Sequence, residues 1–271
     1  MARYRFALRP RWILSHVLIL VLVVVMVNLG FWQLRRLDEK KAHNAEVRRN
    51  EAIAAAPVDT ILQTSDPTSR GSDLAFRRVT VTGTYDTANE VIVRARSSNS
   101  RPGVWVASPL HLANGDGVIV VRGFLPTQGT PDAVPSGAEP PSGMVTVEGL
   151  VQETQTRGLF GATDPSGVRL TDVARVDVER LQQQLPYRLY PVWVQLTSSS
   201  PVQAGGEPEV LPLPTLDEGP HLSYAIQWFI FSTIAVVGYP LILRRSARNR
   251  ELTADEEASE DADESEDLVT A

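Results

Sequence analysis

Two long uncharged apolar runs lie near the two ends of the chain. Residues 12–34 read WILSHVLILVLVVVMVNLGFWQL, and residues 224–243 read YAIQWFIFSTIAVVGYPLIL. A helix rises about 1.5 Å per residue, so about 20 residues cross a hydrocarbon layer of about 30 Å. The pattern therefore predicts two transmembrane helices. A cleaved signal peptide is the alternative for the first run, but the charged segment RRLDEKK follows it in place of a small-residue cleavage site.

Basic residues beside the runs predict the orientation, because cytoplasmic flanks are enriched in Lys and Arg. RRSARNR follows the second run, whereas LDEGPHLS before it contains neither residue type. The segment 1–11 before the first run is also basic, with four arginines. We therefore expect a multi-pass protein of a bacterial-type plasma membrane, with both termini cytoplasmic and the residues between the runs outside the cytoplasm.

The residues between the runs change pattern at Pro57. Residues 35–56 are mostly helix formers without Gly or Pro, which predicts a helical stalk. From residue 57 to 223, short β-branched runs alternate with turn signals such as ANGDG, which indicates an antiparallel sheet or a small open barrel. The expected strands cover residues 76–85, 90–97, 104–112, 117–125, 144–152 and 191–197.

One helix is expected within this domain, over residues 171–186, with Thr171 as its N-cap and Pro186 at its end. The fold class is thus an α+β membrane protein, in which two transmembrane helices flank a β-rich extracytoplasmic domain. Residues 244–271 begin with a basic segment and continue as an acidic tail. The last 21 residues hold ten acidic side chains and almost no large apolar residue, so we expect the tail to be disordered.

Composition narrows the chemistry that this chain can perform. The chain has no cysteine, which excludes disulfides, thiolate zinc sites, thiol catalysis and covalent c-type heme. Only four histidines occur, without an HExxH pattern, and neither GxxxxGK[ST] nor GxSxG is present. We therefore predict neither enzymatic activity nor a nucleic-acid partner.

Five segments, in this order along the chain, resemble one known family. They are LGFWQLRRLDEKK, FRRVTVTGTYD, GVWVASPLHLANGDGVIVVRGFLP, VTVEGLVQETQTRGLF and HLSYAIQWFIFS. Together with one span at each end, they resemble the surfeit-locus (Surf/Shy-type) family of cytochrome c oxidase assembly proteins over residues 29–245. The chain departs from the family pattern at Val168 and Arg169, where an aromatic residue is expected, and in its Pro-rich insertions and acidic tail.

The resemblance implies a role in maturing a heme-copper oxidase, by assisting delivery or insertion of heme a into its largest subunit. The implied partners are that subunit, a heme a synthesis enzyme and membrane lipid, and the implied cofactor is transiently bound heme a. Some bacterial members bind heme a through a histidine whose position matches His221. The alternative is a membrane-anchored scaffold that binds oxidase subunits without heme.

Five residues are candidates for a heme site. His221, Tyr224 and Trp228 share one helix face, where the imidazole could be an axial ligand of heme iron and the aromatic rings could pack on the porphyrin. Arg35 and Arg36 could pair with the propionates. The alternative for both groups is an interfacial aromatic belt with a basic cap. If the arginines pair with propionates, Gln33 and the neighbouring Trp32 would face the second helix or the oxidase.

The remaining candidates are expected to be structural. His16 lies 18 residues before Leu34, about 27 Å along a helix, so it cannot share one heme with His221 and is expected to snorkel toward headgroups. Within the domain we expect bulges or close backbone contacts at two glycines, a satisfied ion pair at one arginine and core positions for two tryptophans. We expect incidental roles for one histidine of the stalk and one of the domain. These residues are Gly83, Gly123, Arg122, Trp105, Trp193, His43 and His111.

Overall fold

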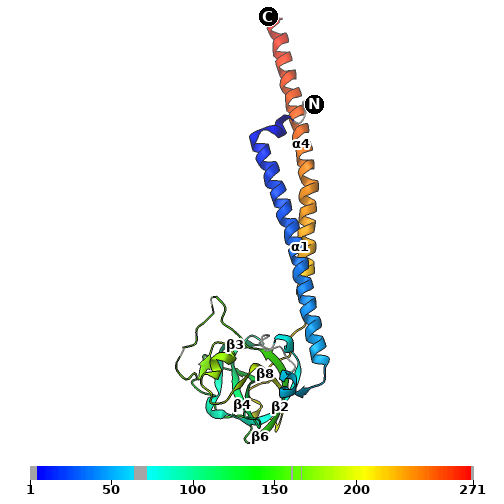
Figure 1. The fold of residues 1–271 in the computed structure, drawn as a ribbon. Helices are drawn as coiled ribbons and strands as arrows, with labels where there is room; N and C mark the ends of the chain where they lie inside the picture. The colour runs from blue at the N-terminus through cyan, green and yellow to red at the C-terminus, as the bar shows by residue number, and fades with distance from the viewer. Residues whose placement is uncertain (1–4, 64–71, 160, 166, 270–271) are drawn as a thin grey trace. The chain divides into compact units, whose positions relative to one another are not determined.

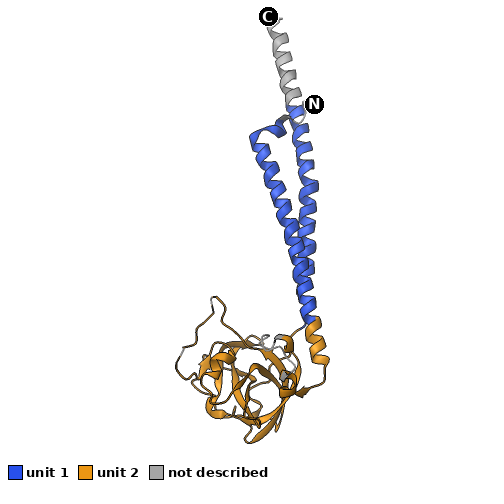
Figure 2. Ribbon diagram, in the orientation of Figure 1, with its two compact units in different colours: residues 1–44, 216–271 blue, residues 45–215 orange. Residues whose placement is uncertain are grey.

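The structure is a computed structural model that describes the chain except residues 1–4, 64–71, 160, 166 and 270–271 (Figure 1). The chain divides into two compact units. One unit combines residues 1–44 with residues 216–271, and the other contains residues 45–215 (Figure 2).

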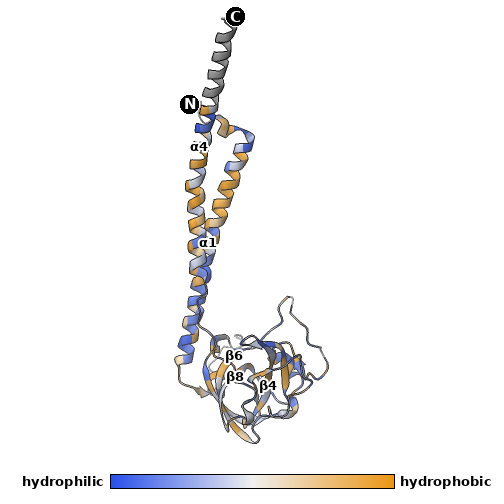
Figure 3. Ribbon diagram, turned by 180° about the vertical axis from the view of Figure 1, so that it is seen from behind, coloured by the Kyte–Doolittle hydropathy of each residue, from blue (hydrophilic) through white to orange (hydrophobic). Residues whose placement is uncertain are grey.

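The first unit is built from two long helices, α1 (Pro10–Ala52) and α4 (His221–Val269), after a short 3₁₀ helix, η1 (Arg5–Leu8). Apolar residues cover mainly the N-terminal half of each helix (Figure 3). Both helices are long and apolar enough to cross a membrane, and only 11% and 6% of their most apolar 18-residue stretches are buried. A core helix of a soluble protein would be mostly buried, so these exposed apolar surfaces indicate a membrane protein.

The two helices run antiparallel and pack against each other within this unit. Gly30 lies so close to Phe229 that a Cβ at position 30 would be 2.7 Å from the ring. Phe31 also meets Phe229 edge to face, with ring centroids 5.4 Å apart. Ala225 and Ser232 are buried on α4. Small residues at such a contact let two helix backbones approach closely, which favours helix association in a membrane.

Both helices extend beyond the apolar runs. The helical stalk that we predicted to residue 56 is the end of α1, which stops at Ala52. At the other end of the chain, α4 continues to Val269, whereas the composition predicted a disordered tail. The compositional argument counted burial only, but Ala and Glu are strong helix formers, and a helix makes its backbone hydrogen bonds without a core.

The second unit contains a ring of five hydrogen-bonded strands in the order β2–β6–β8–β5–β4, which closes because β4 also pairs with β2. All neighbours in the ring are antiparallel except β5 and β8, which are parallel. The five strands are β2 (Arg78–Tyr85), β4 (Arg101–Leu112), β5 (Gly117–Pro126), β6 (Met144–Glu153) and β8 (Leu189–Ser200).

The predicted strands are therefore present, but the prediction of an antiparallel sheet or an open barrel was wrong in two respects. The sheet is mixed, and the ring of strands is closed. The long connection between β6 and β8 brings the chain back between β6 and β5, antiparallel to one and parallel to the other. A parallel pair needs such a long connection, and the alternation of residues within a strand does not reveal which strand becomes its neighbour.

Short elements surround the ring. β1 pairs in parallel with β2, β3 pairs with β4, and β7 pairs in parallel with β3. These elements are β1 (Ala56–Pro57), α2 (Val58–Gln63), η2 (Ser72–Leu74), η3 (Thr87–Asn89), β3 (Val91–Ser98), β7 (Asp172–Val173), α3 (Val178–Gln182) and η4 (Ala204–Gly206).

The helix predicted over residues 171–186 is mostly not formed. Residues 172–173 form β7, and the helix is the short α3, whose N-cap is Asp177 and not Thr171. The Asp177 carboxylate accepts a hydrogen bond from the Arg180 backbone N–H. Val173 and Val176 are buried in the apolar cluster around Trp193. Pairing with β3 and burial of these valines thus outweigh the helix propensity of the segment.

The described core consists of two large clusters of apolar side chains and a smaller third one. Alternate residues of β2 are buried in one cluster, whereas nearly every residue of β5 is buried. In the second cluster Trp193 is buried, and Trp105 is half-buried against it with ring centroids 6.2 Å apart. The predicted core position is confirmed for Trp193 and partly for Trp105.

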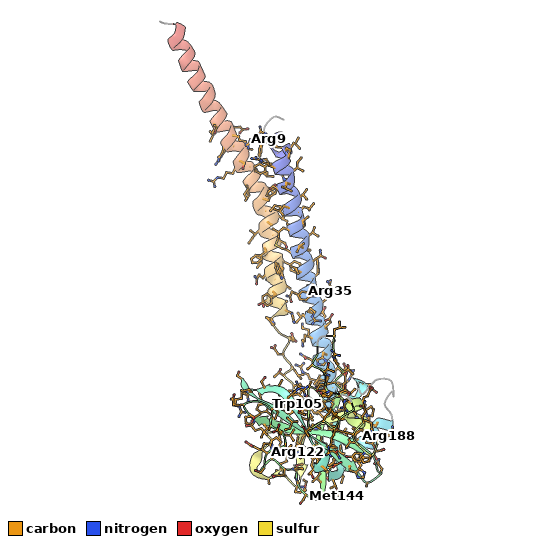
Figure 4. The ribbon with its side chains drawn as sticks, turned by 90° about the vertical axis from the view of Figure 1, so that its left-hand side faces the viewer. Arg9, Arg35, Trp105, Arg122, Met144 and Arg188 are labelled. Atoms are coloured by element: carbon orange, nitrogen blue, oxygen red, sulfur yellow. The ribbon has the colours of Figure 1, made fainter. Side chains whose placement is uncertain are left out.

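Arg122 lies at a β-bulge, labelled in Figure 4. Val121 and Gly123 pair with consecutive residues of β4, so Arg122 is the extra residue and its side chain is fully buried. It pairs with Glu90 at 3.0 Å, which confirms the predicted ion pair. A Cβ at Gly123 would lie 2.3 Å from the Glu209 carbonyl oxygen, so the bulge needs glycine there.

Candidate functional site

The candidate site begins at the turn that leads into α4. The Asp217 carboxylate accepts a hydrogen bond from the Gly219 N–H at 2.9 Å, and Gly219 has φ +70°, a conformation that favours glycine. Pro220 follows, and its carbonyl accepts the first helical hydrogen bond from Tyr224 N–H. This turn makes His221 the first residue of α4, where no preceding helical turn covers its ring.

His221 is held by one contact with α1. Its Nδ1 lies 2.8 Å from Oε1 of Gln33. An amide oxygen only accepts hydrogen bonds, so in the neutral imidazole this contact puts the proton on Nδ1 and leaves the lone pair on Nε2. Within the described part of the chain, no hydrogen bond is recorded for Nε2. A metal-binding histidine is usually held in this way, with its second ring N–H donated to an acceptor.

Tyr224 and Trp228 follow His221 along the same face of α4. Tyr224 is 48% exposed, and Trp228 is half-buried with its ring edge-on to Phe231. Ala225, one position farther round the helix, is buried. The three predicted site residues therefore lie along one flank of α4, beside the surface that packs on α1.

The two candidate arginines do not point the same way. Arg36 is one turn from Gln33 on α1 and so shares its face, whereas Arg35 lies about 200° round the helix from Gln33. Both are exposed, and Arg36 pairs with Glu39 at 2.6 Å (Arg35 is labelled in Figure 4). Arg36 therefore lies on the side of the helix pair that carries His221, whereas Arg35 lies on a different side.

His16 lies near the other end of the apolar segments. Its Nε2 is 3.1 Å from the Ala7 carbonyl oxygen, and its Nδ1 is 2.6 Å from the hydroxyl of Tyr239, which also contacts Ser15 Oγ at 2.8 Å. A neutral imidazole can satisfy both contacts, so neither nitrogen is left for a metal. His16 is thus hydrogen-bonded to protein groups, whereas the sequence predicted that it would snorkel toward lipid headgroups.

The other histidines do not form a site. His111 in β4 packs against Tyr187, with ring centroids 4.7 Å apart. Across the described residues, no group of three or more His, Asp or Glu side chains could hold a metal ion. A single imidazole remains compatible with an axial ligand of heme, because the porphyrin supplies the other nitrogens.

Sequence reasoning named Gln33 without pairing it with His221, and it missed Tyr239, which binds His16. Gln33 is 188 residues from His221, and Tyr239 is 223 residues from His16. The one available signal was a polar residue inside or beside each apolar run, since such residues usually find partners. Gln33 was expected to face the second helix or the oxidase, and its contact with His221 confirms the first alternative.

Comparison with known proteins agrees with this architecture. The model of the SURF1 family matches residues 20–233. The chain is 29% identical over 256 residues to an uncharacterised SURF1-like protein of Mycobacterium bovis, covering 93% of this chain and 91% of the relative. It is 27% identical to a SURF1-like protein of Monosiga brevicollis, covering 84% and 86%, and 24% identical to one of Rickettsia bellii, covering 86% and 92%. The chain therefore belongs to the SURF1 family, which is generally known for cytochrome oxidase assembly.

Proposed function

We propose that this protein assists the delivery or insertion of heme a into the largest subunit of cytochrome c oxidase, and that it binds heme a transiently through His221. The observation that carries the proposal is the hydrogen bonding of the two ring nitrogens of His221. Nδ1 is hydrogen-bonded to Gln33, whereas Nε2 has no hydrogen-bond partner among the described residues. Imidazole nitrogen is a common axial ligand of heme iron.

The surrounding residues fit the rest of such a ligand. A porphyrin is a flat apolar ring with carboxylate side chains, and bound heme would supply an iron that accepts an axial nitrogen. Tyr224 and Trp228 offer aromatic surface on the flank of α4 that also carries His221. Arg36 is the better of the two candidate partners for a propionate, because it shares a face with Gln33.

The proposed role needs binding and release but no bond chemistry, so we propose that the protein is not an enzyme. In the orientation that the basic flanks favour, His221 would be near the extracytoplasmic membrane surface. The largest oxidase subunit and a heme a synthesis enzyme would be the protein partners. Lipid would cover the apolar surfaces of α1 and α4 that lack protein contacts.

A scaffold that binds oxidase subunits without heme is the second candidate. The observation that favours it is Leu159, an apolar side chain that is 92% exposed between β6 and β7. Burial of a leucine in a protein contact would release about 1.5 to 3 kcal/mol. This observation concerns one side chain, so we consider heme binding the better supported function.

The decisive experiment is an absorption spectrum of the full-length protein purified after co-expression with heme a synthesis enzymes. We expect a heme a spectrum for the wild type and for His16→Ala, and its loss for His221→Ala at equal membrane yield. A wild type without heme would favour the scaffold. Loss of heme only in His16→Ala would show that the wrong histidine was chosen.

A second measurement tests the role in assembly independently of heme binding. A strain without this protein should contain less assembled cytochrome c oxidase, with unchanged b-type and c-type hemes. Unchanged oxidase content in a strain that has no second copy of the gene would contradict both candidates.

A further inference from the structure

The contact between Gln33 and His221 is specific in a way that general packing of α1 on α4 does not require. It joins the amide oxygen of one helix to one particular ring nitrogen of the other at 2.8 Å. The neutral imidazole has two tautomers, and the hydrogen bond of one nitrogen decides which nitrogen keeps the lone pair. Gln33 is thus in the position to select the tautomer.

Gly219 lies beside the ring edge opposite this contact. A Cβ at Gly219 would lie 3.4 Å from His221 Cδ2 and 3.5 Å from Nε2, so a side chain at this position would contact the ring edge that carries Nε2. Glycine is also the residue that the φ of +70° favours here. Gln33 holds one edge of the imidazole, and position 219 puts no side chain against the other.

We propose that Gln33 is a positioning residue, which fixes His221 in the tautomer with Nδ1 protonated and thereby presents the Nε2 lone pair to the ligand. This inference rests on the proposed function, in which His221 binds heme iron. Acceptors of this kind commonly change metal affinity by about 10- to 100-fold when they are removed. The same contact fixes the plane of the ring, because the hydrogen bond and the α4 backbone together restrict its rotation.

Substitutions at Gln33 separate the effect of its hydrogen-bond acceptor from the effect of its side-chain volume. Gln33→Glu keeps an acceptor at the same reach and makes the hydrogen bond charge-assisted, whereas Gln33→Leu keeps similar volume without an acceptor. Asn44→Leu is the matched control. Asn44 is a buried residue of α1 whose amide donates to the Asp217 carbonyl oxygen at 3.4 Å, so this variant removes a bond near the same turn without touching His221.

The first measurement needs no heme. Nitrogen NMR of full-length protein with ¹⁵N-labelled histidine, in detergent at alkaline pH, separates protonated from unprotonated ring nitrogens, and His221→Ala assigns the signals. We expect a protonated Nδ1 and an unprotonated Nε2 in the wild type, Gln33→Glu and Asn44→Leu, and a mixture of tautomers in Gln33→Leu. The same single tautomer in Gln33→Leu would overturn the proposal.

The second measurement uses ferric heme b as the probe. We expect Gln33→Leu to lose about 10- to 100-fold in affinity. Gln33→Glu should keep the affinity and lower the reduction potential of the bound iron, because a stronger acceptor makes the imidazole a better electron donor. Asn44→Leu should match the wild type in both respects.

The two measurements distinguish this inference from the proposed function. If the wild type binds heme through His221 and Gln33→Leu binds it equally well, the positioning role fails and the function stands. If the wild type has the expected tautomer but does not bind heme, the proposed function fails, and with it the purpose we assign to Gln33.

Discussion

Arg122 and Glu90 form a buried ion pair, in which Nη2 of the arginine donates to Oε1 of the glutamate at 3.0 Å. The arginine is fully buried, and the glutamate side chain is 10% exposed. The guanidinium also donates to Ser108, to the Gln203 side chain and to the Ala138 carbonyl, at 2.7 to 2.9 Å. Burial lowers the pKa of Arg122, and Glu90 opposes that shift. One side chain thus ties three segments outside the strands to the strand ring.

We predict that Arg122→Met destabilises the second unit (residues 45–215) by about 3 to 5 kcal/mol, because Glu90 would remain buried without a counter-charge. Denaturant unfolding of the full-length protein, followed by circular dichroism, measures the loss. Arg122→Met combined with Glu90→Gln should recover part of it.

Arg101→Met is the matched control. Arg101 makes two hydrogen bonds to Glu209, but both side chains are more than 40% exposed, so water can replace the contact. We expect little change. Equal losses in Arg122→Met and Arg101→Met would contradict the view that burial gives the Arg122 pair its importance.

Tyr85 gives a second prediction, because its hydroxyl is buried and has no hydrogen-bond partner among the described atoms. Burial raises the pKa of Tyr85 above its ordinary value of about 10. The folded state therefore keeps the proton that the unfolded chain loses above about pH 10, so this contribution to stability is complete below that pH and decreases as pH rises toward the folded pKa. Tyr85→Phe should stabilise the unit by about 1 kcal/mol at neutral pH. It should also reduce the loss of folding stability at alkaline pH.

Tyr187→Phe tests the same reasoning at a tyrosine that has a partner. Burial, followed by the 2.8 Å hydrogen bond to Asp86, raises the pKa of Tyr187. Tyr187→Phe should also reduce the loss of folding stability at alkaline pH, but it should destabilise the protein at neutral pH. Destabilisation by Tyr85→Phe would mean that the Tyr85 hydroxyl has a partner, such as a buried water.

The strands of the second unit were predictable because β-branched runs are local signals. Each of the six expected runs contains a strand, five of them in the ring and the sixth being β3. The closed ring was not, because the pairing of Gly83 with Leu112 depends on geometry that no single run encodes. Residues 171–186 contain good helix formers, yet the burial of Val173 and Val176 decides their conformation. Local propensity failed where long-range packing competes with it.

The candidate site divides in the same way. Helical spacing correctly grouped His221 with Tyr224 and Trp228, because residues three and four apart share a face. The same rule, applied to α1, now separates Arg36 from Arg35, but only the contact of Gln33 with His221 reveals which face of α1 matters. That contact joins two helices far apart in the sequence, so no local pattern contains it.

Membrane orientation is a third prediction, and it rests on the basic flanks of the two apolar runs. Reporter fusions after residue 5 and residue 260 should be active in the cytoplasm, and a fusion within residues 57–215 should be active outside it. An external signal from the fusion at residue 260 would reverse the orientation and put His221 on the cytoplasmic side.

The close contact of Gly30 on α1 with Phe229 on α4 gives the last prediction. A Cβ at Gly30 would lie 2.7 and 2.8 Å from two ring atoms of Phe229, closer than real contacts allow, so a side chain there must displace the ring or the helix. Rotation of the Phe229 ring could accommodate a methyl group, so Gly30→Ala should have a small effect. Gly30→Leu exceeds that space, should push the helices apart, and should lower the thermal stability of the helix pair in detergent by about 1 to 3 kcal/mol.

Gly238→Leu is the matched control, because Gly238 lies in the apolar part of α4 and a Cβ there meets nothing within 4 Å. This variant should leave the stability of the helix pair unchanged. Phe229→Ala should restore part of the stability to Gly30→Leu, since it removes the ring that the leucine displaces. Separation of the helices should also lengthen the contact between Gln33 and His221, so Gly30→Leu should show the mixed histidine tautomers expected of Gln33→Leu, whereas Gly238→Leu should not. Equal stability of Gly30→Leu and Gly238→Leu would contradict the close approach of the two helices.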